Sequence, residues 1–259
     1  MAPSSSVDTS IQAPRVRQVS TKAPLRWLAQ GWDDMRRAPS ISLGYGLLVA
    51  LAGVILLWLS HEYTHLAPAL TSGFLLVAPA LAINQYAVSR RLERAEPVNS
   101  VQLFDDWRHN RGSIALFGLG LALTLLAWER ISAVLFALFY GGDVPDLNHF
   151  TAQIWLSGNY RQLALAYVLA GGALATMVFC LSVVSLPLML DRDVDVVTAA
   201  AVSLEAVHLN PRAMLLWAAL IVVCTAIGFV TLMIGLVIVF PVLAHASWHC
   251  YRDLVEPPA

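Results

Sequence analysis

The chain has 259 residues, of which 58% are hydrophobic and 13% charged, with a formal net charge of -1 and a mean hydropathy of +0.66. Soluble globular domains are about one quarter charged, so this composition excludes an ordinary soluble domain and favours a protein whose apolar side chains face lipid. No basic tract is dense enough for a nucleic-acid surface, and no nucleic-acid partner is expected.

The chain begins with a segment of a different composition. Residues 1–20 are rich in Ser, Pro, Gln and Val, which is typical of a disordered segment. We therefore predict a disordered cytoplasmic tail over residues 1–23, a single membrane domain over residues 24–255 and a short tail over residues 256–259.

Long apolar runs fill the predicted membrane domain. A helical span needs about 20 mostly apolar residues, and this requirement is met by residues 41–60, 66–88, 112–140 and 162–190. A last run, residues 212–251, would form a rod of roughly 60 Å as one helix, about twice the hydrocarbon thickness. We predict a hairpin there, turning between Gly228 and Gly235. The expected fold is all-α, polytopic, with about six transmembrane helices.

The basic residues indicate the orientation of these spans. Fourteen of the 16 Lys and Arg residues lie in segments that six spans would place on one side, against only Arg130 and Arg161 on the other. Cytoplasmic loops carry the excess of Lys and Arg, so both termini are predicted to be cytoplasmic.

A repeated proline pattern suggests three related hairpins. Gly73 precedes Pro79 by six residues, as Gly235 precedes Pro241, while a third proline, Pro187, lacks the glycine. An aromatic residue follows at seven positions (Tyr86, Trp248) and an arginine at eleven (Arg90, Arg252). Each hairpin is preceded by a short amphipathic stretch, residues 25–37, 101–108 or 194–208, which we interpret as an interfacial helix. Chance is the alternative, because prolines are common in membrane helices.

Several segments resemble a known family. Residues 31–34 (Gly-Trp-Asp-Asp), 42–46, 72–79 and 185–192, and the ending Trp248-His249-Cys250-Tyr251-Arg252, are similar to an uncharacterised bacterial integral-membrane family of unknown function, over roughly residues 24–255. Some members are labelled cytochrome c oxidase subunits. The resemblance implies a multi-pass inner-membrane protein and no established activity. The chain has about half the spans of the catalytic oxidase subunit and no adjacent His-His pair, which excludes that subunit but leaves an accessory or assembly role open.

Two histidine patterns could carry chemistry. His61-Glu62-Tyr63-Thr64-His65 matches H-E-x-x-H, in which a helix presents two zinc ligands and a general base. It occupies a short predicted loop with no evident third ligand, so we interpret it as a solvated turn. His245 and His249 are spaced i, i+4 on one helical face and could bind a metal or haem, with His208 as a third ligand. The ordinary alternative is a pair of neutral histidines bonded to carbonyls.

The remaining polar candidates have ordinary explanations as well. Glu129 and Arg130 fall near the outer end of their span, where snorkelling accounts for them. Asn84 could line a transport path or satisfy a carbonyl freed by Pro79. Asp191, Asp193 and Asp195 alternate like cation ligands but lack the rest of a calcium loop, and Asp193 or Asp195 is expected to cap the helix that follows.

These observations favour a non-catalytic protein that organises or assists partners in the bacterial inner membrane. The alternatives are a small transporter or channel built on the proline-bent spans, and a haem- or metal-binding respiratory accessory protein. The candidate binding residues are His245, His249, His208, Asn84 and Asp191, and the structural residues are Pro79, Pro187, Pro241, Gly73 and Gly235. No catalytic residue, metal or cofactor is predicted. The expected partners are the lipid bilayer and a membrane protein or a second copy of the chain.

Overall fold

The computed structural model describes residues 14–62, 74, 76, 78–99, 105–139 and 160–257, and in these ranges every regular element is a helix. This confirms the predicted all-α fold. The elements are α1 (Ala23–Arg37), α2 (Pro39–Glu62), α4 (Ile83–Glu93), the short 3-10 helix η2 (Arg108–Asn110), α6 (Arg111–Phe139), α8 (Arg161–Ser182), α9 (Ser185–Asp191), α10 (Val196–Leu209), α11 (Pro211–Val230) and α12 (Leu236–Leu254).

Four helical stretches are long and apolar enough to cross a membrane, namely Pro39–Leu56, Arg108–Phe139, Arg161–Asp191 and Pro211–Val230. Of the predicted second span, residues 66–88, residues 66–73, 75 and 77 lie outside the described residues, whereas residues 74, 76 and 78–81 are helical and α4 forms the end of the span. The last apolar run is the hairpin that its length predicts, because residues 231–235 form a turn between α11 and α12.

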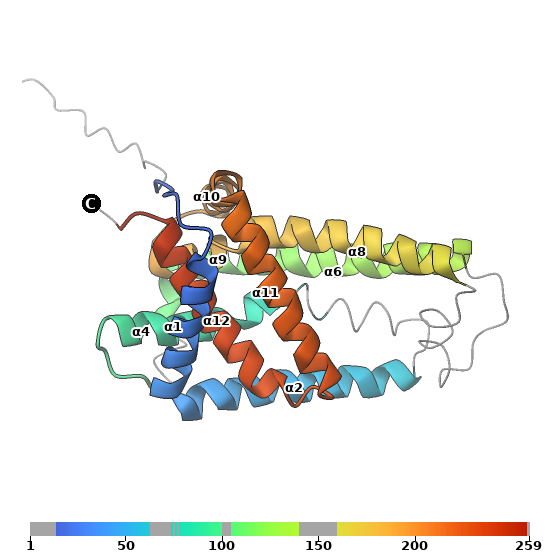
Figure 1. The fold of residues 1–259 in the computed structure, drawn as a ribbon, viewed down its shortest axis with the longest axis horizontal. Helices are drawn as coiled ribbons and strands as arrows, with labels where there is room; N and C mark the ends of the chain where they lie inside the picture. Colours follow the sequence, from blue (N-terminus) through green and yellow to red (C-terminus); the bar gives the residue numbers. More distant parts are fainter. Residues whose placement is uncertain are drawn as a thin grey trace, which may run out of the picture.

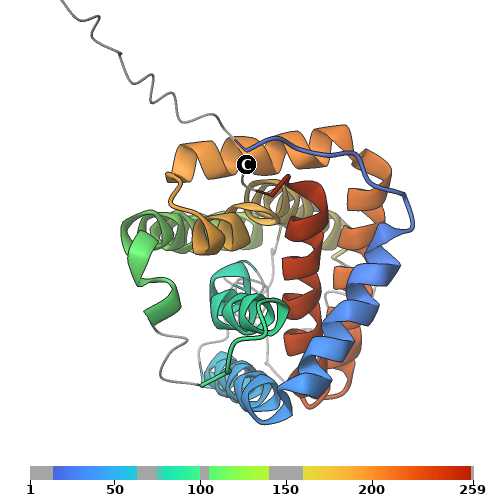
Figure 2. The ribbon, with the colours of Figure 1, turned by 90° about the vertical axis from the view of Figure 1, so that its left-hand side faces the viewer.

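The helices run in two directions. α6 and α8 pack side by side and lie along the same direction as α2 (Figure 1). Figure 2 shows α2, α4, α6 and α8 nearly end-on, with α1, α10 and α12 lying across them. α1 and α10 thus have the transverse orientation expected of interfacial helices. The remaining expected interfacial stretch is residues 101–108. Residues 101–104 lie outside the described residues, and residues 105–110 form short helical turns.

α12 contacts more of the fold than a terminal helix usually does, because two glycines let other helices approach its backbone. A Cβ atom on Gly31 of α1 would lie 2.5 Å from the Val242 carbonyl oxygen and 2.6 Å from the Ala246 nitrogen. A Cβ atom on Gly46 of α2 would collide with the Val237 carbonyl oxygen. Both helices therefore contact α12 at a separation that only glycine permits.

The amino-terminal segment is also held against the end of α12. The amide of Arg17 donates to the Leu254 carbonyl at 2.7 Å, and the amide of Glu256 donates to the Arg15 carbonyl at 3.0 Å. The Asn210 side chain, between α10 and α11, accepts from the Val19 amide and donates to the Arg17 carbonyl. The disordered tail expected over residues 1–23 is therefore corrected for residues 14–23, because these hydrogen bonds order residues 14–22 and Ala23 begins α1.

The helix break before Pro187 is closed by a side chain from α10. α8 ends at Ser182 and α9 begins at Ser185, as expected where a proline removes a hydrogen bond to the residue four positions earlier. Ser203 donates to the Cys180 carbonyl at 2.7 Å and accepts from the Val184 amide at 3.2 Å. The Cys180 carbonyl and the Val184 amide, which would bond to each other in a continuous helix, are thus satisfied inside the protein, as a membrane location requires. Pro241, in contrast, lies within an unbroken α12.

α10 has two different faces. Ala199, Val202, Ser203 and Ala206 are buried against the bundle, while Val197 and Leu204 of the predicted apolar stripe are 78% and 48% exposed. The stripe therefore faces away from the bundle. The apolar stripe of an interfacial helix is expected to contact either lipid headgroups or the underside of the bundle, and its outward position here suits contact with lipid.

The glycine contact between α2 and α12 gives a first prediction. Gly46→Ala should lower the stability of the protein by about 2 kcal/mol, because the added methyl group overpacks a backbone contact. Gly44→Ala is the matched control on the same helix, since a Cβ atom there would have nothing within 4 Å, and it should be neutral or slightly stabilising. Thermal unfolding in one detergent measures both, and equal melting temperatures would contradict the close contact.

Candidate functional site

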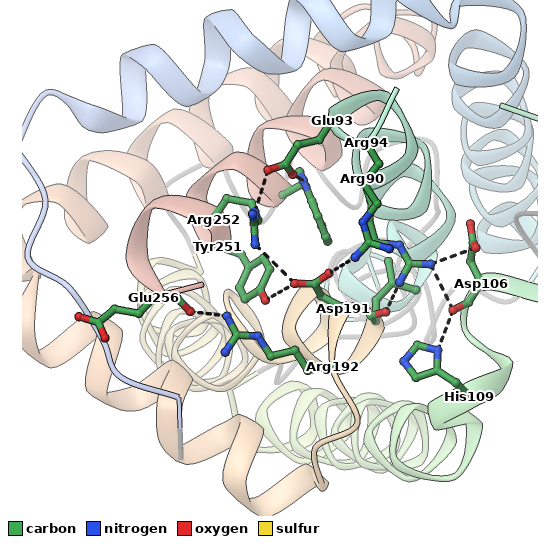
Figure 3. A network of polar contacts seen from close by, with 12 residues as sticks. Arg90, Glu93, Arg94, Asp106, His109, Asp191, Arg192, Tyr251, Arg252 and Glu256 are labelled. Atoms are coloured by element: carbon green, nitrogen blue, oxygen red, sulfur yellow. Dashed lines mark hydrogen bonds and ion pairs between the residues drawn. The ribbon is translucent and has the colours of Figure 1, made fainter. Parts of the chain in front are cut away.

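Polar side chains from distant parts of the sequence meet at one end of the bundle. The carboxyl-terminal ends of α4, α9 and α12 pack against one another there, and Figure 3 shows the resulting network. We call this region, which carries Arg90, Asp191 and Arg252, the polar end.

Three arginines connect these helix ends in a cycle. Arg90 of α4 donates to the Leu190 carbonyl of α9 at 2.5 Å. Arg192, directly after α9, donates to the Glu256 carbonyl beyond α12. Arg252 of α12 donates to Glu93 of α4 at 3.0 Å (Figure 3). Each arginine thus bonds to the next helix end, and we call Arg90, Arg192 and Arg252 the arginine ring. They follow the three prolines, so the geometry agrees with the predicted repeat.

Asp191 is the carboxylate at the centre of this network. It accepts hydrogen bonds from the Tyr251 hydroxyl at 2.7 Å and from Arg94 at 3.0 Å, and Arg252 lies 3.6 Å away. Its side chain is only 6% exposed, so these cations and the hydroxyl replace the water that a buried carboxylate loses. Beside it lies an open pocket of about 300 Å³ lined by Glu93, Arg94, Asp191, Trp248 and Arg252.

A second buried carboxylate, Asp106, holds α4 to the segment before α6. It accepts two hydrogen bonds from Arg91, at 2.6 and 2.8 Å, and Arg90 lies 3.0 Å away. The hydrogen bonds that Arg91 donates to Asp106 raise the pKa of the Arg91 guanidinium. The amphipathic pattern predicts that Asp106 and Asp34 face water. Both expectations are wrong, because each carboxylate is paired inside the protein.

The two histidines of α12 share a face, as their spacing predicts, and both have protein partners. His245 is fully buried between the Ser42 hydroxyl of α2 at 3.0 Å and the Ser89 hydroxyl of α4 at 2.7 Å. His249 bonds to Asp34 of α1 at 2.8 Å. His208 does not join them, since it is exposed on α10. In this geometry the pair connects three helices to α12, and its role as a ligand site stays a prediction.

Asn84 lies in α4, next to Gln85. Its amide donates to the Tyr45 hydroxyl of α2, and Gln85 donates to the Ser42 carbonyl at 3.4 Å. The side-chain oxygens of both residues are buried without a protein hydrogen-bond partner. Buried amide oxygens of this kind usually have a partner, so both atoms could accept from a water molecule or bind a cation.

The alternating aspartates of residues 191–195 do not converge. Asp191 belongs to the network around Tyr251, while Asp195 accepts from the Val197 and Thr198 amides and is the predicted N-cap of α10. Hydrogen bonds from Thr198, first from its hydroxyl and then from its amide, lower the pKa of Asp195. Within the described residues, no group of three His, Cys, Asp or Glu side chains could hold a metal ion.

The structure describes only the first two residues of the H-E-x-x-H sequence, and of the two structural glycines it describes Gly235 but not Gly73. α2 ends at Glu62, and Tyr63, Thr64, His65 and Gly73 lie outside the described residues. Gly235 lies at the end of the α11–α12 turn, where its amide donates to the Thr231 hydroxyl at 2.9 Å.

Sequence reasoning missed the partners of Asp34 and Asp106 and the arginine ring itself. The repeated proline-to-arginine interval places Arg90 and Arg252 at equivalent positions, which is a detectable signal. Their acceptors include backbone carbonyls, however, and every residue has a carbonyl. No sequence pattern identifies which carbonyl accepts.

Comparison with known proteins agrees with this description. Residues 66–191 match a family described as "Predicted integral membrane protein (DUF2189)". This confirms the resemblance to an uncharacterised integral-membrane family, whose description does not mention an oxidase. Neither a curated protein nor a solved structure matches the chain.

The arginine ring gives a second prediction. Arg90→Met should cost about 3 kcal/mol of stability, because it leaves Asp106 and the Leu190 carbonyl buried with a partner missing. Arg108→Met removes a pair with Asp105 in which both side chains are exposed, and it should cost less than about 0.5 kcal/mol. Thermal unfolding of both variants in the same detergent makes the comparison. Similar losses would show that the ring does not stabilise the polar end.

Proposed function

We propose that this membrane protein is a non-catalytic organising or accessory protein of the bacterial inner membrane, whose polar end meets partner proteins. One observation supports this more than any other. The charged side chains around Asp191 and Asp106 gather at one end and bond mainly to one another, and the buried His245 nearby is likewise bonded to Ser42 and Ser89.

Hydroxyl groups within the apolar helices support the same proposal. Thr124 donates to the Gly120 carbonyl at 2.9 Å, and Thr176 donates to the Gly172 carbonyl at 2.8 Å. Each bond stays inside its own helix. Thr176, which a transporter would point into a central cavity, is exposed on the outside of the bundle. These groups are therefore satisfied without water and need no polar path.

The proposed orientation follows from charge. Arg36, Arg37, Arg111 and Arg212 are exposed at the beginnings of α2, α6 and α11, where lipid headgroups would lie. Because Lys and Arg are concentrated on the cytoplasmic side of membrane proteins, we place the polar end in the cytoplasm together with both chain termini.

This orientation can be checked with reporters. An alkaline phosphatase fused after Ala259 should be inactive and a green fluorescent protein at the same position fluorescent, because both would lie in the cytoplasm. The same pair inserted after Asn148 should give the opposite results. An active phosphatase after Ala259 would place the carboxyl terminus outside and contradict the proposed orientation.

The surface offered to a partner is acidic in part. Asp33, Asp105 and Glu205 are exposed in three different segments, whereas Asp34 and Asp106 are paired with His249 and Arg91. The exposed carboxylates can therefore recognise a basic surface without loss of folding. Charge complementarity of this kind mainly steers association and selects partners.

Reversing these charges tests the proposal. Asp33→Lys combined with Asp105→Lys should leave the melting temperature nearly unchanged, because both sites are exposed, and should reduce recovery of co-purifying proteins several-fold. Glu129→Lys, ten residues before the end of α6, is the control for a single charge reversal away from the polar end. Quantitative mass spectrometry after gentle solubilisation makes the measurement. Unchanged recovery with the double variant would remove the support for a partner surface at the polar end.

A small transporter is the alternative, and the unpartnered oxygens of Asn84 and Gln85 favour it. Carboxamide oxygens are ligands for hard cations, and both atoms are buried. Flux of protons or alkali cations in proteoliposomes would distinguish the proposals. A flux that Gln85→Leu abolishes while the protein stays folded would support transport and contradict a purely organising role.

A further inference from the structure

The hairpin formed by α11 and α12 does not have the geometry of two crossing helices. We propose that it is a re-entrant hairpin, which enters the bilayer from the polar end, turns within the hydrocarbon and returns to the same side. Its tip, residues 230–234, would then contact acyl chains and not outer water. The inference depends on the membrane location of the chain and not on its proposed function as an organising protein.

The first evidence is the level at which the hairpin turns. Met233 in the turn lies against Gly53, where a Cβ atom would be 3.2 Å from the Met233 sulfur. α2 continues for nine residues beyond Gly53 to Glu62, which adds roughly 14 Å of helix. The tip therefore contacts α2 part-way along its length and not at its outer end. In Figure 1, α11 and α12 slant across the direction of α2, α6 and α8.

The second evidence is the short length of α12 between its contact with the transverse helix α1 and the turn. α1 crosses α12 at Val242 and Ala246, and α1 ends directly before α2 begins, at the level of the exposed Arg36 and Arg37. Only the residues from Gly235 to Val242 extend beyond this crossing. They span roughly 10 Å of helix, whereas the hydrocarbon core is about 30 Å thick. α12 is correspondingly absent from the helices long and apolar enough to cross a membrane, whereas α11 is among them but runs at a slant in Figure 1 and ends at the same tip.

The surface of the tip is chemically suited to hydrocarbon. Val230, Leu232 and Ile234 are 83%, 77% and 73% exposed, and no Asp, Glu, Lys or Arg occurs between Arg212 and Arg252. The turn contains Gly235 but none of the other residues that favour turns in water, namely Asn, Asp, Pro and Ser. Contiguous exposed apolar side chains at a turn are costly in water and favourable in lipid.

The backbone of the turn is also suited to hydrocarbon, where an unsatisfied amide is costly. Each amide from Thr231 to Leu236 donates a hydrogen bond within the hairpin, at 2.9 to 3.1 Å. The Thr231 hydroxyl has a central part, since it accepts from the Gly235 amide and lies within hydrogen-bonding distance of the Ile227 and Gly228 carbonyls. The turn thus needs no water to satisfy its donors.

Two backbone angles point in the same direction. Leu232 and Met233 adopt φ values of 53° and 68°, in the left-handed region that glycine and asparagine occupy most readily. The chain keeps large apolar side chains at these positions in spite of the strain. Met233 packs against α2 with 3% exposure, and Leu232 is exposed. Met233 thus contributes packing and Leu232 an apolar surface for lipid, and glycine could provide neither.

Spin labels can measure the environment of the tip. Ile234→Cys and, as a control, Ile55→Cys are introduced separately after replacement of Cys180, Cys224 and Cys250, and labelled in proteoliposomes. Ile55 is exposed on α2 two residues beyond Gly53, so it reports nearly the same depth as the tip. Leu204→Cys on α10 provides an interfacial reference. Collision rates with oxygen, which concentrates in hydrocarbon, and with a water-soluble nickel chelate are then compared.

The expected result is frequent collision with oxygen and rare collision with the nickel chelate at residue 234, with a depth close to that of residue 55. Frequent collision with the chelate would place the tip in water and make the hairpin a crossing pair. Rare collision with both reagents would show that protein, such as a second copy of the chain, covers the tip. Either of these two results overturns the proposal. A folded labelled protein is verified first by an unchanged elution volume.

Discussion

The fold depends on the close contacts that α12 makes with α1 and α2. Gly31 and Gly46 bring two helices from the start of the chain onto the backbone of the last helix. This contact positions His249 against Asp34, His245 against Ser42, and Trp27 of α1 against Asp253 at 2.6 Å. Without it, α1 would have little to pack against, and the segment before α1 would lose its hydrogen bonds to the end of α12. Small residues have this use in membrane helices generally, because packing replaces the hydrophobic effect there.

The polar groups follow a second constraint, which is that lipid offers them no partners. At the break between α8 and α9 the protein inserts Ser203, and at the hairpin turn it uses the Thr231 hydroxyl. At the polar end, charged side chains are paired around Asp191 and Asp106. Elsewhere, the buried oxygens of Asn84 and Gln85 are exceptions among the described residues. The distribution divides the molecule into a polar region that proteins can recognise and an apolar region for lipid.

Much of the fold could be predicted from the sequence because the responsible signals are local. Hydropathy located the apolar helices, excess length predicted the turn after α11, and Asp195 marked the start of α10 as an N-cap. The burial of Asp34 could not be predicted in this way. Its helix is amphipathic and Asp34 sits beside the exposed Asp33, but its partner His249 lies 215 residues away along the chain. The same reason applies to Arg90 and Arg252, whose positive charge predicts an orientation while their acceptors cannot be read from the sequence. Hydropathy also treats α12 as one apolar segment, although part of it is covered by protein and not by lipid.

The pairing of the chain's two ends has a consequence for its biogenesis. α1 leaves the ribosome long before its main packing partner, α12, has been made. Until then α1 has only the membrane surface to cover its apolar side, and residues 14–22 lack the backbone groups at the end of α12 to which they bond. The compact polar end can form only after α12 has been made. A nascent or truncated chain that lacks α12 would display the uncovered face of α1, including Trp27, and quality-control proteases could recognise incomplete molecules by that face.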